Sequence, residues 1–513
     1  MSNAPRDVSI PVPAKDEPLI FERSHAGLCA VSLPAADVPP IDRSRAVPPE
    51  LLADAPPPLP EVGEADLVRH YTQLAHRLFS VDGNFYPLGS CTMKYNPKVN
   101  EYAAGLPGLT ALHPYQPVDD LQGILELLYH TRIFLAEIAG LSEVTLQPCA
   151  GAHGEMTGVM IINAYHRSRG EDRVKILAPD TSHGTNPASC AMCGRHACTV
   201  KSRPDGRVDL ADLARQVDEN TAALMITNPN TAGVFDPQIV EIARILHDHG
   251  ALLYLDGANM NAILGIARPG DFGVDVMHFN VHKTFSTPHG CGGPGAGPVA
   301  VAEHLRQFLP GPQVVQCEDG SYSLENGGLN SIGRVRSFVG QVGVLVRTYA
   351  YIRALGPDGL RQVSEKAVLS ANYVAARLRD HYRFPFDPPY AHEFILVPEF
   401  RDQGVTEMDV AKRLLDEGIH PPTMSWPVAH CLMIEPTETE SLATLDNFAD
   451  AMIRIAHEAR TMPERLHHAP HTTPVRRLDE VRAARQPDLC WQPPAENHAA
   501  KGSASAASKR IEA

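Results

Sequence analysis

The feature that most constrains the fold is a series of short segments that are apolar throughout and alternate with helical patterns. A strand with one face in water would alternate apolar and polar residues, and these segments do not. The stretches at 210–219 and 237–250 between some of them carry apolar residues at helical spacing. We therefore expect an α/β fold, with helices on both faces of a large, mostly parallel sheet. The predicted strands lie at 174–179, 222–227, 251–256, 275–280 and 297–302.

Helical patterns flank this region on both sides. Apolar residues at helical spacing, stopped by Gly140, predict a helix over 121–139. A long helix is predicted over 330–355, and it leads into a smaller C-terminal α/β region. In that region the predicted strands are 393–400 and 430–436, and the predicted helices are 406–418 and 440–459.

The two ends of the chain differ in composition from its middle. The first 60 residues hold 13 prolines, which favours an extended arm lying on a partner subunit; the alternative is a flexible leader. The Ala-, Pro- and Ser-rich end is expected to be disordered. The predicted divisions are an arm and following segment at 1–80, a large domain at 81–355, a small α/β domain at 356–470 and a tail at 471–513.

Charge and composition argue against several classes of protein. The net charge of −15 and the pI of about 5.9 argue against a nucleic-acid binder, which needs a basic face. The first residues lack the pattern of a secretory signal, and no apolar run reaches the roughly 18 residues of a membrane span. The ten cysteines form no small-domain framework, so we expect reduced thiols and a cytoplasmic protein that binds no membrane.

Polar residues follow the predicted strands at the point where each one ends. Asp180, Asn228 and Asp256 come directly after, or at the end of, three of them, and Lys283 comes just after a fourth. Ligands bind beyond the carboxyl ends of the strands in open α/β sheets. One such residue alone is often only a turn or cap, but four of them, including a lysine, indicate a site at this edge.

Lys283 stands in the stretch NVHKTFSTPHGCGGPGAG, flanked by His282 and His289 and followed by five glycines. Partial burial beside cationic groups favours a neutral amine, which can attack a carbonyl carbon. The glycines permit close approach of a planar ligand. A lysine with an aspartate aimed at a pyridine nitrogen is the pairing that pyridoxal 5'-phosphate requires, so Lys283 and Asp256 predict this cofactor.

A cofactor of this kind also needs a phosphate site. The small residues of 149–158 stand immediately before a helical pattern, and the N–H groups at a helix start bind anions. The stretch 180–189 adds hydroxyl groups and His183, and Thr284 adds a hydroxyl beside the lysine. Each signal is weak by itself.

Six segments together resemble the P-protein family of the glycine cleavage system, glycine dehydrogenase (decarboxylating). The resemblance follows the chain in order over roughly residues 20–460. It implies the aspartate-aminotransferase-like fold (fold type I) of pyridoxal phosphate enzymes, in the split bacterial form. Because Lys283 is present, it implies the half that carries the cofactor, subunit 2. The segments are GSCTMKYNPKVNE (89–101), QPCAGAHGEMTG (147–158), PDTSHGTNPAS (179–189), TNPNTAGVFD (227–236), YLDGANMNA (254–262) and the lysine stretch at 280–297.

The resemblance implies a role for each matching residue. Lys283 would form the Schiff base, Asp256 would face the pyridine nitrogen, and His153 would stack on the ring, although a helix-start cap is the alternative for His153. Asn228 would approach the ring hydroxyl, unless it only turns the chain before Pro229. The residues near the phosphate would be Ala150, Gly151, Ala152 and Thr284, and those lining the pocket would be Ser182, His183 and Thr185.

The resemblance also implies a reaction and partners. Glycine would take the place of Lys283 on the cofactor and lose its carboxylate as carbon dioxide, and the aminomethyl group would pass to the lipoyl arm of the H-protein. His282 and His289 are candidates for proton transfer. Arg334 and Arg336 are candidate carboxylate contacts or, equally, exposed helix residues. The partner would be subunit 1, in a heterotetramer of two plus two chains.

Two departures from the family and two rival functions remain. Cys190, Cys193, His196 and Cys198 lie close together, but structural zinc usually joins two separated ligand pairs, so we expect apolar packing and no metal. Cys291 stands where the family often has glycine.

The enzyme rival is an aminotransferase, another amino-acid decarboxylase or a sulfur-transferring lyase. The non-enzyme rival is a catalytically silent subunit, and the presence of Lys283 argues against it.

Overall fold

A computed structural model describes residues 17–289, 295–387 and 389–490 of the chain. The chain divides into two units, Met1–Thr473 and Pro474–Ala513. The described part of the second unit contains one short helix, α14 (Glu480–Arg485). Much of the predicted tail, the first 16 residues of the predicted arm, and Cys291 lie outside the described residues. Among the helices of the described residues, none is long and apolar enough to cross a membrane.

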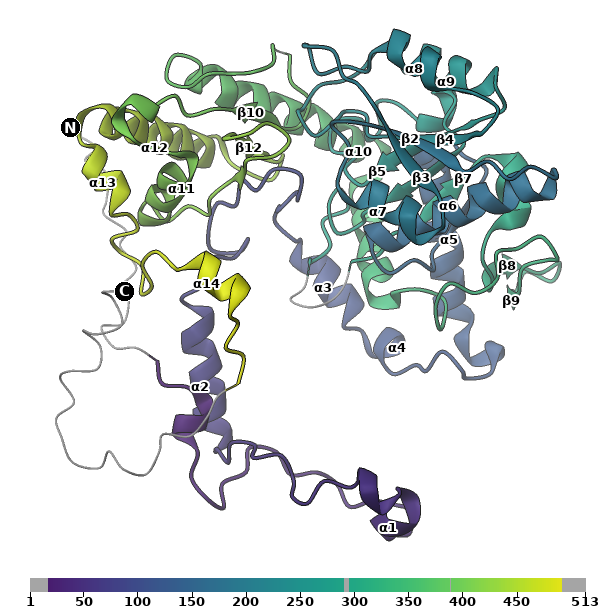
Figure 1. The fold of residues 1–513 in the computed structure, drawn as a ribbon. Coiled ribbons are helices and arrows are strands. Elements are labelled where there is room, and N and C mark those ends of the chain that lie inside the picture. Colours follow the sequence, from purple (N-terminus) through teal and green to yellow (C-terminus); the bar gives the residue numbers. More distant parts are fainter. Residues whose placement is uncertain (1–16, 290–294, 388, 491–513) are drawn as a thin grey trace, which may run out of the picture. The chain divides into compact units, whose positions relative to one another are not determined.

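A seven-stranded sheet in the first unit holds all five predicted strands (Figure 1). Its order is β1-β7-β6-β5-β4-β2-β3, and the pairs from β3 to β6 are parallel, whereas β7 is antiparallel to both of its neighbours. The prediction of a mostly parallel sheet is confirmed. The strands are β1 (Glu143–Thr145), β2 (Lys175–Pro179), β3 (His196–Val200), β4 (Thr221–Ile226), β5 (Leu252–Gly257), β6 (Val276–Phe279) and β7 (Val299–Val301).

Neighbouring residues of the central strands enter different apolar clusters, because both faces of the sheet are covered. Leu224 and Leu253 belong to one cluster, while the next residues, Met225 and Tyr254, belong to another. This packing explains why these strands are apolar throughout. The helices of this region are α5 (Gln122–Ala139), α6 (Gly151–Ser168), α7 (Thr185–Met192), α8 (Leu210–Gln216) and α9 (Ile239–His247).

The predicted helix over 330–355 is wrong in its first half. Helix α10 spans Val342–Leu378 with a kink at Gly356, which has φ of 61°. Before it, Gly333, Phe338 and Gly340 all have positive φ, which no α-helix accommodates. A Cβ at Gly340 would lie 2.4 Å from the carbonyl oxygen of Leu146, so the chain passes too close to the large sheet for a helix there.

The C-terminal region has its own three-stranded antiparallel sheet and its own apolar cluster, shared with the second half of α10. Its predicted strands and helices are present. No division falls at 355/356 within the first unit, so that predicted domain boundary stays a prediction. The elements are β10 (Phe394–Leu396), α11 (Glu407–Asp416), β11 (Thr423–Met424), β12 (Leu432–Ile434), α12 (Leu442–Thr461) and α13 (Pro463–His467).

The segment after the arm connects the two sheets. Leu88 forms a bridge with Ile434 of β12, and the N–H of Gly89 donates to the carbonyl of Met433. This contact holds residues 88–94 beside the small sheet. The remaining elements are α1 (Arg43–Ala46), α2 (Glu64–Ala75), α3 (Lys98–Ala104), α4 (Pro107–Thr110), the hairpin β8 (Gln313–Gln316) and β9 (Tyr322–Glu325), and 3-10 turns at Ile20–Arg23, Pro49–Leu51, Val118–Leu121, Pro269–Phe272, Glu303–Phe308 and Arg401–Gln403.

Candidate active site

Of the four polar residues predicted at one sheet edge, Asp180 and Asn228 form hydrogen bonds within turns. Asp256 is buried at the end of its strand, and Lys283 lies in the turn after the neighbouring strand. Asp256, at the end of β5, is buried and has Oδ1 3.4 Å from Nε2 of His278. Asp180 instead accepts hydrogen bonds from Ser202 and is exposed, so it closes a turn. The Asn228 amide donates to the carbonyl of Asp236 at 3.1 Å and accepts from its N–H at 2.9 Å. These bonds fit the turn-forming alternative for Asn228, and its contact with a ring hydroxyl stays a prediction.

Lys283 lies in the turn that follows β6. Its backbone N–H donates to the carbonyl of Asn280, but among the described residues no hydrogen bond or ion pair engages its side-chain nitrogen. Several buried atoms nearby in the chain also lack partners within the described ranges: Oδ1 of Asn280, Nδ1 of His282, Oγ1 of Thr287 and Nε2 of His289. Buried polar groups are almost always bonded, so this group of free atoms indicates a place for a polar ligand.

The two histidines beside Lys283 are held neutral. Burial, with His289 and Lys283 close by, lowers the pKa of His282 to about 3, and burial and Lys283 also lower the pKa of His289. The rings of His282 and His289 meet edge to face at 5.2 Å. A histidine with a pKa near 3 is a weak base at neutral pH, so the lowered pKa argues for a hydrogen-bonding role of His282, and its predicted proton transfer stays a prediction.

The start of α6 lies against the ends of the central strands. Ala150 is its N-cap, and no side chain caps the helix, which leaves the N–H groups of Gly151, Ala152 and His153 without intrahelical partners. A Cβ at Gly151 would lie 2.4 Å from Oδ1 of Asn280, so only glycine permits this approach. The predicted phosphate residues thus form a helix start close to the Lys283 turn.

His153 stands in the first turn of α6 with its ring half-buried. Its Nδ1 accepts a hydrogen bond from the N–H of Cys149 at 3.2 Å, which fixes the ring orientation. This bond agrees with the alternative of a helix-start residue, and stacking of His153 on a cofactor ring stays a prediction. Burial lowers the pKa of His153, and the Arg336 guanidinium nearby lowers it further.

The arginine candidates lie in a loop, so the alternative of exposed helix residues is wrong. Arg334 is exposed, whereas Arg336 is half-buried. One terminal nitrogen of Arg336, Nη1, is buried and has no hydrogen-bond partner among the described residues. Because Arg336 also acts on His153, it is the better placed of the two for a carboxylate.

The remaining predicted pocket residues are engaged in short hydrogen bonds. The Thr284 hydroxyl accepts from the N–H of Met260 at 2.9 Å. In the loop after β2, Nδ1 of His183 lies 2.7 Å from the Thr185 hydroxyl, and Ser182 donates its N–H to Pro179 in a turn. Burial lowers the pKa of His183, and both Asp256 and Lys283 act on it, so this loop lies near the lysine.

Glu155 on α6 was missed as a site residue, although it stands inside a recognised segment. It is 4% exposed, and its oxygens accept from Thr185 at 2.7 Å and Ser189 at 3.2 Å. One carboxylate oxygen each of Glu155 and Asp256 and one ring nitrogen of His278 lie within 4.8 Å of one another. Burial and the Asp256 charge raise the pKa of Glu155 to about 7. The one sequence signal that could have indicated Glu155 is its position about one turn after the predicted helix start.

A second buried carboxyl pair comes from the small sheet. Glu393 accepts the N–H of Ser90 at 2.6 Å, and Glu435 accepts the N–H and hydroxyl of Thr92 at 3.0 and 2.8 Å. Burial raises the pKa of both glutamates, and the Lys283 charge opposes the shift. His392 beside them is buried, with both ring nitrogens unbonded within the described residues. No periodic pattern in the sequence indicated this cluster.

The cysteine cluster does not converge on one point. Cys190 is buried with Sγ 3.6 Å from Sδ of Met225, and Cys193 packs against the same apolar cluster. Cys198 packs against a different cluster, and His196 is exposed. This arrangement agrees with the packing interpretation.

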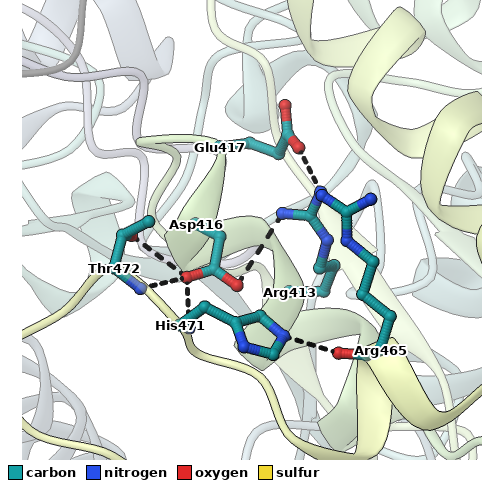
Figure 2. A pocket seen from close by; sticks show the side chains of 6 residues that line it. All are labelled: Arg413, Asp416, Glu417, Arg465, His471 and Thr472. Atoms are coloured by element: carbon teal, nitrogen blue, oxygen red, sulfur yellow. Dashed lines mark hydrogen bonds and ion pairs between the residues drawn. The ribbon is translucent and has the colours of Figure 1, made fainter.

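A hollow of about 290 Å³ in the C-terminal region contains none of the predicted site residues. Figure 2 shows its side chains tied to one another: Asp416 accepts from His471 and Thr472, and Arg413 pairs with Glu417 at 2.8 Å. These bonds anchor the end of the first unit to α11.

Comparison with protein families gives two matches along this chain. The model described as "Glycine cleavage system P-protein" matches residues 44–325, and the one described as "Glycine dehydrogenase, C-terminal domain" matches residues 363–475. Among curated proteins, the chain is 54% identical over 482 residues to the probable glycine dehydrogenase (decarboxylating) subunit 2 of Bacillus licheniformis, covering 93% of this chain and 99% of that one. The protein of the same name in Listeria monocytogenes is 52% identical over 479 residues, covering 93% and 98%.

Two solved structures share the fold. A glycine decarboxylase (P-protein) of the glycine cleavage system, in inhibitor-bound form, superposes with a TM-score of 0.67 at 23% identity, covering 80% of this chain and 94% of that one. The sphingosine-1-phosphate lyase of Burkholderia pseudomallei gives 0.62 at 15% identity, covering 82% and 97%. These likenesses confirm the predicted fold class.

Proposed function

The chain belongs to the P-protein family of the glycine cleavage system, and on that premise we propose that it is the glycine-decarboxylating subunit 2, with pyridoxal 5'-phosphate bound at Lys283. The observation that carries the site assignment is the amine of Lys283, which has no partner among the described residues. It stands in a turn with buried atoms that also lack partners there, and Asn280 of this turn lies against the uncapped start of α6. The family favours glycine decarboxylation over transamination or sulfur transfer.

The residues present fit the proposed cofactor. The uncapped N–H groups of Gly151 and Ala152 would bind the phosphate, and the close approach at Gly151 leaves no room for a Cβ. Asp256 would accept a hydrogen bond from the pyridine nitrogen. Lys283 would hold the aldehyde carbon, and His153 would lie on the ring face, oriented by Cys149.

The chain's own residues then serve binding, orientation and proton placement. Bound pyridoxal phosphate supplies an electron-poor ring that accepts the electrons left when a carboxylate departs as carbon dioxide. Arg336 would hold the glycine carboxylate through its free guanidinium nitrogen. His282 and His289, held neutral, would donate or accept hydrogen bonds beside Lys283 without adding charge. Burial and the neighbouring Glu435 raise the pKa of Glu393, which favours its neutral acid near Lys283.

The partners follow from the same premise. We propose that the aminomethyl group passes to the lipoyl arm of the H-protein, that subunit 1 completes a heterotetramer of two plus two chains, and that the enzyme works in the cytoplasm. Exchange of labelled carbon dioxide into glycine tests the reaction, with this chain, its subunit 1 and lipoylated H-protein mixed. We expect exchange that depends on all three proteins. Absence of exchange with the cofactor fully bound would reject the assigned reaction.

A further inference from the structure

Asp256 is linked to a second buried carboxyl group, that of Glu155. In the amide orientation that satisfies both neighbours, Nδ2 of Asn186 donates to Oδ2 of Asp256 at 3.1 Å and to Oε2 of Glu155 at 3.0 Å. One amide on α7 therefore joins a residue of β5 to a residue of α6. A displacement of Glu155 would be transmitted to Asp256 through a single side chain.

We propose that Glu155 is a positioning residue for Asp256, acting through Asn186, and that its ionisation makes the affinity for pyridoxal phosphate depend on pH near neutrality. This inference rests on the proposed cofactor site. Glu155 is fixed by hydroxyl donors on α7, Thr185 to Oε1 and Ser189 to Oε2, so its carboxyl group has little freedom to turn away.

Four titratable groups around Glu155 do not change their charge near neutral pH, whereas Glu155 itself does. Burial lowers the pKa of His278 and His183, raises that of Tyr254 well above its ordinary value and raises that of Cys190 to about 12. Those four groups are therefore neutral at pH 7. The charges that act on Glu155 are those of Asp256 and Lys283, and burial with Asp256 raises its pKa to about 7.

The charge of Glu155 determines whether its ionisation strengthens or weakens the binding of pyridoxal phosphate. An ionised Glu155 adds a negative charge beside Asp256 and so stabilises a proton on the pyridine nitrogen, whereas a protonated Glu155 does not. Binding of the protonated ring therefore lowers the pKa of Glu155, and by reciprocity ionisation of Glu155 strengthens binding. A change of one pKa unit corresponds to about a tenfold change in affinity.

The experiment compares Glu155→Gln with the wild-type full chain by titrating each cofactor-free protein with pyridoxal 5'-phosphate and following the absorbance of the bound cofactor. We expect dissociation constants within about twofold of each other at pH 5.5 and about tenfold apart at pH 8.5. The exposed Glu126→Gln on α5 is the matched control and should follow the wild type at both pH values. A ratio that is the same at both pH values would overturn the proposal, because a purely steric role is independent of pH.

A milder variant keeps the test valid if Glu155→Gln folds poorly. Ser189→Ala removes a hydrogen bond that favours the charged form, so the midpoint of the pH dependence should move to higher pH. An unmoved midpoint would count against Glu155 as the titrating group.

A melting experiment without cofactor separates this inference from the proposed function. The folded state raises the pKa of Glu155 from 4.5 to about 7, so the wild type loses stability relative to Glu155→Gln as pH rises between these values. A constant difference in melting temperature would overturn the inference. A wild-type chain that binds no pyridoxal phosphate would instead reject the proposed function, while the melting result would still report on Glu155.

Discussion

Two polar regions of this chain, the turn around Lys283 and the hollow around Arg413, contrast in how their groups are paired. Around Lys283 the amine and several buried atoms lack partners among the described residues. In the hollow, Arg413 bonds Glu458 and Glu417, each at 2.8 Å. Asp416 accepts hydrogen bonds from His471 and Thr472 (Figure 2). Most polar groups of the hollow are paired: Oδ2 of Asp416 lacks a hydrogen bond among the described residues, but it lies 3.7 Å from Nη1 of Arg413. The concentration of unpaired buried atoms around Lys283, compared with the single one at Asp416, therefore distinguishes the candidate active site from this structural junction.

The largest effect that tests this contrast is expected at Lys283. Lys283→Ala removes the only amine proposed to attach the cofactor, so glycine–carbon dioxide exchange should fall by about a thousandfold or more, roughly 4 kcal/mol of barrier. The melting temperature of the cofactor-free chain should stay within a few degrees of wild type, because the amine makes no bond within the described structure. Retained exchange would show that Lys283 is not the attachment point.

The opposite pattern is expected at Arg413. Arg413→Met removes the buried partner of Glu458 and leaves only the exposed Arg465, at 3.2 Å, so it should destabilise the fold by roughly 3 kcal/mol, measured by denaturant unfolding. Cofactor affinity should be unchanged in the folded fraction. The control is Arg454→Met, since Arg454 is 56% exposed and pairs with the same Glu417 at the surface, where loss costs less than about 1 kcal/mol. Equal effects of the two variants would contradict a structural role for the hollow.

A pH effect of intermediate size is expected at Glu393. Burial and Glu435 raise its folded pKa above the ordinary 4.5, so its contribution to stability is present below pH 4.5 and is lost as pH rises through the folded pKa. Glu393→Gln should therefore gain in melting temperature relative to wild type between pH 5 and 8. The exposed Glu464→Gln should show no such trend, and a trend shared by both variants would refute the assignment to Glu393.

The smallest effect is expected at His282. With a pKa of about 3 it is already neutral across the working range, so His282→Gln should lower exchange without moving the pH midpoints between pH 5 and 9. A lost or shifted step in the pH–rate profile would restore the proton-transfer role that the sequence predicted.

The sequence was most informative where burial is uniform along an element. The five apolar strands could be predicted from their burial. Asp256 and Lys283 could be placed at one sheet edge because they stand at the ends of the neighbouring parallel strands β5 and β6, while their pairing on a cofactor stays a prediction. The start of α10 could not be predicted, because left-handed residues such as Phe338 carry no strong sequence signal. The edge strand β3 was missed because most of its residues are exposed.

The contribution of the small sheet could not be predicted for a different reason. Glu393 lies about three hundred positions from Ser90, and their hydrogen bond depends on how two separately predicted regions pack. Glu155 was missed because a glutamate in a helix is usually exposed. Its burial on α6 beside Asp256 becomes visible only in the structure.

The attachment of the cofactor to one amine is tested most directly by reducing the protein loaded with pyridoxal 5'-phosphate with borohydride, digesting it and mapping the modified peptide. We expect a single stoichiometric pyridoxyl group on Lys283. A pyridoxyl group on another lysine, or none in a chain that retains glycine–carbon dioxide exchange, would contradict it.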